Sequence, residues 1–308
     1  SVDVRHEQAA AMAAHSYSRV LGKPGVCFAA SGPGATNLIT GVGNAFLDGV
    51  PVVALGGASA LSQSGMGAFQ EERQVHIATP FCKFAHGIES VSRIPYYVEM
   101  ATRHSIYGRP GACYLDMPDD IIQGQCDLDK VSAVGRVPEP PRMIAPQENI
   151  EAALNLLEKA KNPLIIVGKG MAWARAESEV RGFVDRTQLP FVRSPQGKGV
   201  VPDDHPLSVA AARTLALQQA DVVFLMGARF NWIFHFGLAP RFSKDVKVIQ
   251  LDISPEEIHH NKQTEVALVG DGKAIMGQIN KALAERQWFY PKDTSWRKAL
   301  SEKAAANA

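Results

Sequence analysis

Short apolar runs alternate with longer helical stretches along the first 134 residues. The runs 25–31, 51–57 and 112–118 are rich in valine, leucine and aromatic residues and end in glycine, serine or proline, which is typical of buried strands. The alanine-rich stretches 7–20 and 35–49 predict helices beside them. This alternation predicts a parallel sheet that is covered by helices on both faces.

A second strand-and-helix pattern follows a proline-rich segment. Residues 135–147 hold four prolines and no apolar periodicity, so we expect a linker there, between a first domain over 1–134 and a second over 148–285. In the second domain, 149–162 predicts an amphipathic helix, and 163–170, 221–229 and 246–254 predict strands. The fold class predicted is therefore α/β, with two doubly wound parallel-sheet domains.

Both ends of the chain predict a longer polypeptide. The first ten residues look like the middle of a strand-and-helix unit, so we expect a truncated amino terminus. Residues 286–308 predict a linker and an opening helix that lead to a further domain.

Composition and charge restrict the classes of partner that this chain is expected to bind. The chain has 308 residues, 46% of them hydrophobic, and its 32 basic side chains nearly balance 31 acidic ones, which argues against nucleic acid or a membrane surface. The four cysteines show no paired spacing, which argues against a zinc site or a disulfide framework. With no signal peptide in the first residues, we expect a cytoplasmic protein, and a peroxisomal one is the alternative.

The motifs RHEQAA at 5–10 and SGPGATN at 31–37 are the strongest local signals. Further segments follow in order: MGAFQE (66–71), SIYGRPGACYLDMP (105–118), KGVVPDDHP (198–206), GARFNWIFHFG (227–237) and QLDISPEE (250–257). Together they resemble the acetolactate synthase, oxalyl-CoA decarboxylase and 2-hydroxyacyl-CoA lyase branch of the thiamine-diphosphate enzymes. The resemblance implies a pyrimidine-binding domain, a Rossmann-like central nucleotide-binding domain, and assembly as a homodimer or homotetramer.

Glu7 is the first candidate catalytic residue. In the family, a glutamate that is hydrogen-bonded to the aminopyrimidine ring of thiamine assists proton removal from the thiazolium, and the resemblance assigns this role and cofactor contact to Glu7. From the residues alone, a glutamate favoured at a helix start by the macrodipole is the preferred interpretation of Glu7, and the resemblance reverses this preference. The resemblance also implies that Gly34, Thr36 and Asn37 lie near the pyrimidine or the substrate, whereas the alternative is an ordinary strand-to-helix turn.

Phe69 and Gln70 separate the subfamilies. Oxalyl-CoA decarboxylases carry a Tyr-Glu pair where this chain has Phe-Gln, and the lyases carry the Phe-Gln form. A neutral amide can donate a hydrogen bond to a substrate oxygen without repelling developing negative charge, so Gln70 is a second candidate catalytic residue. The alternative is a polar loop residue. For His76 and His86 we expect surface or packing roles.

Basic and acidic residues follow several strands and one helix of the pattern. Such residues suit the phosphates and ribose of a nucleotide, and the resemblance implies a site for an adenine nucleotide such as ADP. Solvated loop charges are the competing interpretation. The candidate nucleotide-binding residues are Arg109, Lys169, Arg229, Asp252 and Asp271.

The segment GDG at 270–272 invites a magnesium assignment, because thiamine enzymes bind Mg²⁺ through Gly-Asp-Gly and a downstream asparagine. No asparagine occurs between 281 and 306, and the segment instead predicts a strand end with Asp271 capping a helix. We expect no metal ligand in this chain, and Mg²⁺ and the diphosphate bound by a domain outside it.

The expected function is a thiamine-diphosphate-dependent lyase that cleaves or forms a 2-hydroxyacyl-CoA, with formyl-CoA and an aldehyde or ketone as the other partners. The alternatives are an oxalyl-CoA decarboxylase, an acetolactate synthase-like enzyme, or a non-catalytic adenine-nucleotide-binding module.

Overall fold

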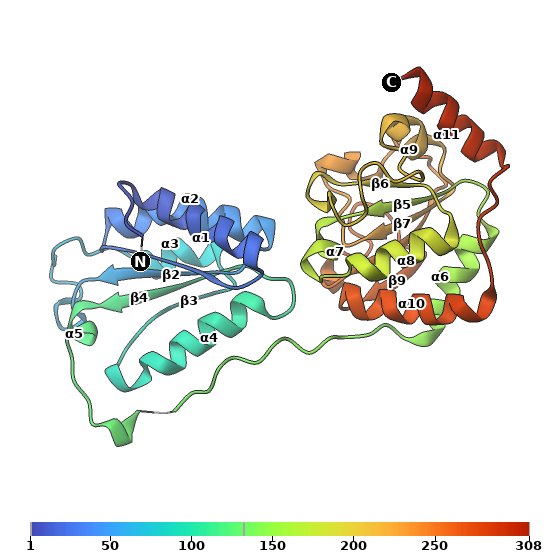
Figure 1. The fold of residues 1–308 in the computed structure, drawn as a ribbon. Helices are drawn as coiled ribbons and strands as arrows, with labels where there is room; N and C mark the ends of the chain where they lie inside the picture. Colours follow the sequence, from blue (N-terminus) through green and yellow to red (C-terminus); the bar gives the residue numbers. More distant parts are fainter. Residues whose placement is uncertain (1, 132, 308) are drawn as a thin grey trace. The chain divides into compact units, whose positions relative to one another are not determined.

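The computed structural model describes residues 2–131 and 133–307 and divides into two compact units, Ser1–Pro140 and Pro141–Ala308. Each unit is built on one sheet whose strands all pair in parallel, which confirms the predicted fold class (Figure 1). Residues 133–146 carry no helix or strand. No helix of the described residues is long and apolar enough to cross a membrane.

The first sheet has the strand order β1-β2-β4-β3, and helices cover both of its faces (Figure 1). Helices α1 and α2 pack on each other over one face, and α4 covers the other. The short helix α3 follows the loop after β2, and the short helix α5 follows β4. The elements are α1 (Glu7–Leu21), β1 (Gly25–Ala29), α2 (Pro33–Asp48), β2 (Val52–Ala58), α3 (Gln74–Ala78), β3 (Phe84–Gly87), α4 (Ile94–Ile106), β4 (Ala112–Pro118) and α5 (Asp119–Ile122).

The second sheet has the order β6-β5-β7-β8-β9, and α10 packs beside both α6 and α8. Strands β5 and β7 are fully buried, as expected for the centre of a parallel sheet. The elements are α6 (Gln147–Lys159), β5 (Pro163–Val167), α7 (Lys169–Trp173), α8 (Glu177–Thr187), β6 (Phe191–Arg193), α9 (Arg213–Gln219), β7 (Val222–Met226), β8 (Lys247–Asp252), β9 (Val266–Val269), α10 (Gly272–Arg286) and α11 (Ser295–Ala306).

The segment after 285 differs from the expected linker. It buries Tyr290, Trp296 and Leu300 in the core of the second unit, and the indole N–H of Trp296 donates to Pro163 O at 3.0 Å. The sequence pattern of this tail did not show which of its apolar side chains are buried, because the neighbouring Phe289 is exposed. Helix α11 is therefore part of the second unit.

Parallel pairing places the carboxyl ends of all strands of a sheet along one edge. In the first unit, α1 leads into β1 and runs back along it, so Glu7 lies at this carboxyl edge with the start of α2. Arg109, which follows a helix and precedes β4, lies at the opposite, amino edge. The direction of each element thus decides which candidate residues can meet.

Candidate functional site

Glu7 and Asn37 form the centre of the candidate site in the first unit. Glu7 opens α1, and Asn37 lies just inside α2, where its Nδ2 donates to Glu7 Oε2 at 3.1 Å. The backbone N–H of Glu7 itself, and then the Asn37 amide, hold the pKa of the Glu7 carboxyl below its usual value. The half-exposed carboxylate is therefore ionised at neutral pH and can accept a further hydrogen bond.

Gly34 and Thr36 flank this pair in different ways. A Cβ built on Gly34 would lie 3.6 Å from Glu7 Oε1, so the glycine keeps the space beside the carboxylate open. The Thr36 hydroxyl donates to Pro33 O at 3.1 Å, within the first turn of α2. The structure brings Glu7, Gly34 and Asn37 together, while the Thr36 hydroxyl is used locally.

Gln70 lies directly over the turn between β1 and α2. The Ser31 hydroxyl donates to Gln70 Oε1 at 3.2 Å, and a Cβ on Gly32 would come within 2.8 Å of Gln70 Cβ. Gly32 has φ +60°, and Gln70 itself has φ +54°, a conformation that few non-glycine residues adopt. The Gln70 loop and the SGPGATN motif therefore meet at the same edge of the sheet.

Two carboxylates organise the loop before Gln70. Glu71 accepts hydrogen bonds from the backbone N–H groups of Gly65, Gly67 and Ala68 at 2.6, 3.1 and 3.2 Å. Asp120 accepts from two further backbone N–H groups at the start of the loop, at 2.9 and 3.2 Å. These bonds lower the pKa of both carboxyls. In this loop, side-chain carboxylates thus bind backbone N–H groups that a helix or strand would pair with backbone carbonyls.

Gln74 is a site residue that the sequence did not reveal. Its side chain is buried at the carboxyl ends of three strands: Oε1 accepts from Gly32 N at 2.5 Å, and Nε2 donates to Gly57 O at 2.9 Å and to Asp116 Oδ1 at 2.7 Å. The Tyr114 hydroxyl also donates to Asp116 Oδ1, at 2.6 Å. In the polar run EERQVH nothing distinguishes this glutamine from a solvated neighbour.

The two histidines take the roles expected. His76 is exposed. His86 stacks on Tyr97 with ring centroids 4.7 Å apart, and its Nδ1–H donates to Gly87 O at 2.6 Å.

In the second unit, the loops after β5 and β7 pack backbone on backbone. A Cβ on Gly168 would lie 2.2 Å from Gly227 O, so only glycine fits there. Gly168 N donates to Met226 O at 2.8 Å, and Gly170 N donates to Gly227 O at 2.9 Å. This packing sets Lys169, the first residue of α7, at the switch point between β5 and β7, where such sheets bind ligands.

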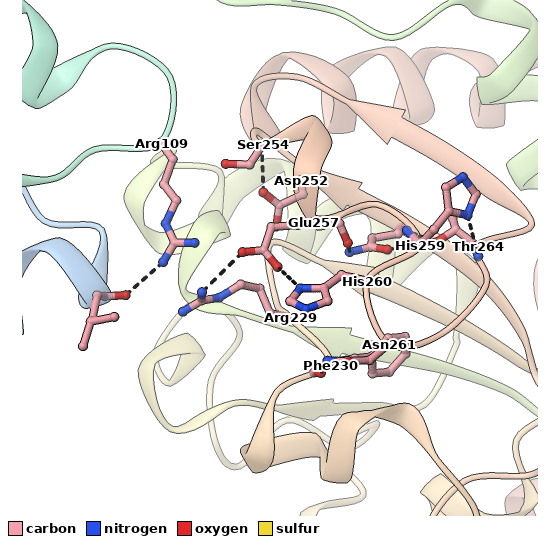
Figure 2. Close-up of polar contacts among 12 residues, drawn as sticks. Arg109, Arg229, Phe230, Asp252, Ser254, Glu257, His259, His260, Asn261 and Thr264 are labelled. Atoms are coloured by element: carbon pink, nitrogen blue, oxygen red, sulfur yellow. Dashed lines mark hydrogen bonds and ion pairs between the residues drawn. The ribbon is translucent and has the colours of Figure 1, made fainter. Parts of the chain in front are cut away.

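Arg229 lies three residues beyond the end of β7, Asp252 ends the neighbouring strand β8, and both lie among several polar side chains (Figure 2). Arg229 Nη1 is 3.3 Å from Glu257 Oε1, and His260 Nδ1 is 3.4 Å from Glu257 Oε2. Asp252 is buried, and its Oδ1 accepts from Ser254 N at 2.9 Å. Because Glu257 partly balances the charge of Arg229, a phosphate would have to compete for this guanidinium.

Asp271 and Arg109 each make contacts of their own. Asp271 caps α10 by accepting from Ala274 N at 2.8 Å, which confirms the capping interpretation, and it also pairs with Arg142 at 2.9 Å. Arg109 belongs to the first unit, where its Nη2 donates to Leu47 O at 2.9 Å (Figure 2). Over residues 2–131 and 133–307, no group of three or more His, Cys, Asp or Glu side chains is placed to hold a metal ion.

Models of known protein families match segments of both units. A model described as the thiamine pyrophosphate enzyme N-terminal TPP binding domain matches residues 1–77, and one described as the thiamine pyrophosphate enzyme central domain matches residues 150–279. This chain belongs to the thiamine pyrophosphate enzymes. Glu7, Asn37 and Gln70 fall in the first match, and Lys169, Arg229, Asp252 and Asp271 in the second. Arg109 lies between the two.

Among the curated relatives of this chain is the human 2-hydroxyacyl-CoA lyase 1, which is 43% identical over 306 residues and matches 99% of this chain and 53% of the relative. The Arabidopsis thaliana 2-hydroxyacyl-CoA lyase is 39% identical, over 98% of this chain and 54% of the relative. The Escherichia coli oxalyl-CoA decarboxylase is 36% identical, over 100% of this chain and 55% of the relative. The chain thus spans about half the length of the curated relatives it matches.

Proposed function

We propose that this chain is the pyrimidine-binding and central part of a thiamine-diphosphate-dependent lyase that cleaves a 2-hydroxyacyl-CoA to formyl-CoA and an aldehyde or ketone. Relatives that are named 2-hydroxyacyl-CoA lyase, at 39–44% identity, support this choice. Within the chain, the observation that carries it is the ionised Glu7 carboxylate held by Asn37 at the carboxyl edge of the first sheet.

The residues at this edge fit the pyrimidine end of thiamine diphosphate. A half-exposed carboxylate can accept a hydrogen bond from a ring nitrogen, and Gly34 leaves open space beside it. When bound, the cofactor supplies a nucleophilic carbanion and stores the electrons of the broken bond. Glu7 holds a proton at the aminopyrimidine ring, and Asn37 orients Glu7. Burial of the carboxyl by a bound ring would desolvate Glu7 and oppose the lowering of its pKa, which would suit exchange of that proton.

Gln70 is proposed to donate a hydrogen bond to the substrate. With Ser31 bound to its Oε1, the same amide still offers Nε2 as a donor. The overall reaction breaks the bond between the thioester carbon and the hydroxyl-bearing carbon. The hydroxyl proton leaves as the aldehyde or ketone forms, and the formyl carbon gains one proton, so atoms and charges balance. A neutral donor suits this step because negative charge develops on oxygen.

Two further parts of the proposal concern groups outside this chain. We propose that Mg²⁺ and the diphosphate are bound by residues beyond these 308, and that the enzyme works as a homodimer or homotetramer. An acyl-CoA is proposed as the substrate in keeping with the names of the relatives.

The test uses the full-length enzyme and its Glu7→Gln variant. The wild type should convert a 2-hydroxyacyl-CoA to formyl-CoA, and the variant should lose at least about 100-fold in kcat because it cannot exchange a proton with the ring. Glu72→Gln, at an exposed position of the first unit, is the control and should keep wild-type activity. Near-normal turnover by Glu7→Gln would refute the assignment.

The nearest alternative is an oxalyl-CoA decarboxylase, which the 36% identity to the Escherichia coli enzyme favours. Release of carbon dioxide from oxalyl-CoA, with no cleavage of a 2-hydroxyacyl-CoA, would establish that alternative. The Phe69-Gln70 pair supports the lyase.

We also propose an adenine-nucleotide site, of the ADP type, at the carboxyl edge of the second sheet. Its proposed ligands are Lys169, which follows β5, Arg229, which follows β7, and Asp252, which ends β8. Millimolar ADP should raise the melting temperature of the full-length protein, and less so for Arg229→Ala. Tight ADP binding without any turnover would instead favour a non-catalytic nucleotide-binding module.

A further inference from the structure

We propose that Gln74 is a positioning residue that holds Gln70 against the turn between β1 and α2, an inference that rests on the proposed lyase function. Gln74 lies four residues after Gln70 and begins α3. It is bonded to the ends of β1, β2 and β4 at once, so the loop that carries Gln70 is anchored where the candidate site is built.

The contacts of Gln74 determine the orientation of its amide. Oε1 accepts from the Gly32 N–H, and Nε2 donates to the carbonyl of Gly57 and to the carboxylate of Asp116. Rotating the amide by half a turn would set N–H against N–H and carbonyl against carboxylate, so only one orientation satisfies all three partners. Gln74 is 3% exposed, so water cannot take over these bonds.

The link from Gln74 to Gln70 runs through Gly32. The side chain of Gln74 fixes the Gly32 N–H, and Gly32 in turn lies against the Cβ and backbone of Gln70, so closely that a Cβ on Gly32 would clash with both. A shift of Gly32 towards Gln70 must therefore move Gln70. The Gln70 amide is thus placed by a residue that is buried beneath it.

Neither glutamate nor methionine can replace Gln74 without loss of some of its hydrogen bonds. A methionine of similar length would leave the Gly32 N–H, the Gly57 carbonyl and one bond of Asp116 unsatisfied. A glutamate would still accept from Gly32 but would set its carboxylate against Asp116, which the Tyr114 hydroxyl also approaches. An Asp116→Asn change beside Gln74→Glu would restore a donor opposite that acceptor.

The first experiment is a double-mutant cycle in the full-length enzyme. Gln74→Met should lower kcat for the 2-hydroxyacyl-CoA roughly 10- to 100-fold, as small displacements of a positioned group do. Calorimetric affinity for thiamine diphosphate with Mg²⁺ should stay within about twofold. Gln70→Ala and Gln70→Ala/Gln74→Met should have the same kcat within about twofold, because Gln74 acts through Gln70. The control is Gln63→Met, at an exposed glutamine of the same loop.

Several results would overturn the proposal. The first is a kcat of the double variant that is lowered by the product of the two single effects. The second is a wild-type kcat in Gln74→Met. The third is an affinity for thiamine diphosphate that falls by as large a factor as kcat in Gln74→Met. A second test is rescue: Q74E/D116N should recover at least about tenfold in kcat over Q74E alone, and no recovery would contradict the charge argument.

Hydrogen exchange separates failure of this inference from failure of the proposed function. If the wild type neither binds thiamine diphosphate nor turns over, the lyase assignment falls, and exchange still tests the anchor. Gln74→Met should speed exchange of the amides of Gly32 and residues 65–71, and Gln63→Met should not. Unchanged exchange in Gln74→Met would overturn the positioning role.

Discussion

Replacing Gly168 by alanine should disturb the loop that carries Lys169 and lower the stability of the second unit. The new Cβ would lie 2.2 Å from Gly227 O and 2.5 Å from Ala228 Cβ, so one of the two loops has to move. Overpacking of this kind costs about 1–3 kcal/mol. The two backbone hydrogen bonds that join the loops are each worth about 1 kcal/mol and would be strained or lost. The free energy of unfolding should therefore fall by roughly 2–4 kcal/mol.

Tryptophan fluorescence is the assay for this change, because Trp173, Trp232, Trp288 and Trp296 all lie in the second unit. For a unit of this size, each kcal/mol lowers the melting temperature by about 2–4 °C. The control is Gly182→Ala in the interior of α8, where a Cβ meets no atom within 4 Å. It should gain about 0.5–1 kcal/mol. A Gly168→Ala protein that melts as high as this control would refute the packing argument.

Three further predictions follow from single contacts. Trp296→Ala should lower the free energy of unfolding by about 3–5 kcal/mol. Trp232→Ala, at a side chain that is 74% exposed, should change it little. Equal melting temperatures of these two variants would contradict the docking of α11. Glu71 has a pKa below its ordinary value of 4.5. Its ionised form therefore protects the amides of Gly65, Gly67 and Ala68 above pH 4.5, and this protection is lost as pH falls through the lower, folded-state pKa. The protection factors of these amides, taken relative to the intrinsic exchange rate at each pH, should fall only in that acidic window, and Glu71→Gln should already show the fall at pH 7. Asp271→Ala should cost about 1 kcal/mol in urea unfolding through loss of the α10 cap, and an unchanged free energy of unfolding would contradict the stabilising role of this cap.

The fold was predictable wherever a strand is long and apolar. Strands β1, β2, β4, β5, β7 and β8 lie within one residue of the predicted starts or inside the predicted ranges, because buried central strands need continuous apolar sequence. Strand β3 was not predicted, because its four half-buried residues include a histidine that packs by stacking. Strand β6, with three residues, is defined by its pairing with β5 and carries almost no pattern of its own.

The candidate site was predictable only in part. The resemblance pointed to Glu7 and Asn37, which are 30 residues apart, and the structure joins them by a hydrogen bond. The Glu257 partner of Arg229 and the three strand-end partners of Gln74 are contacts between distant segments, and residue type alone does not disclose them. A buried glutamine and a solvated one read alike in a sequence. What differs is whether the surrounding backbone leaves N–H and carbonyl groups that need a partner.

The loop from residue 59 to 73 carries Gln70, and its conformation depends on side chains that are not themselves proposed to contact the substrate. It has almost no regular secondary structure, so its shape depends on Asp120 at its start, Glu71 inside it and Gln74 at its end, each bonded to backbone groups. Gln70, the proposed hydrogen-bond donor to the substrate, is therefore placed by side chains of other residues. Changing Phe69-Gln70 to the Tyr-Glu pair of the decarboxylases alters the donor but leaves these three anchors intact. If chemistry at position 70 alone separates the two activities, this exchange should shift substrate preference without loosening the loop.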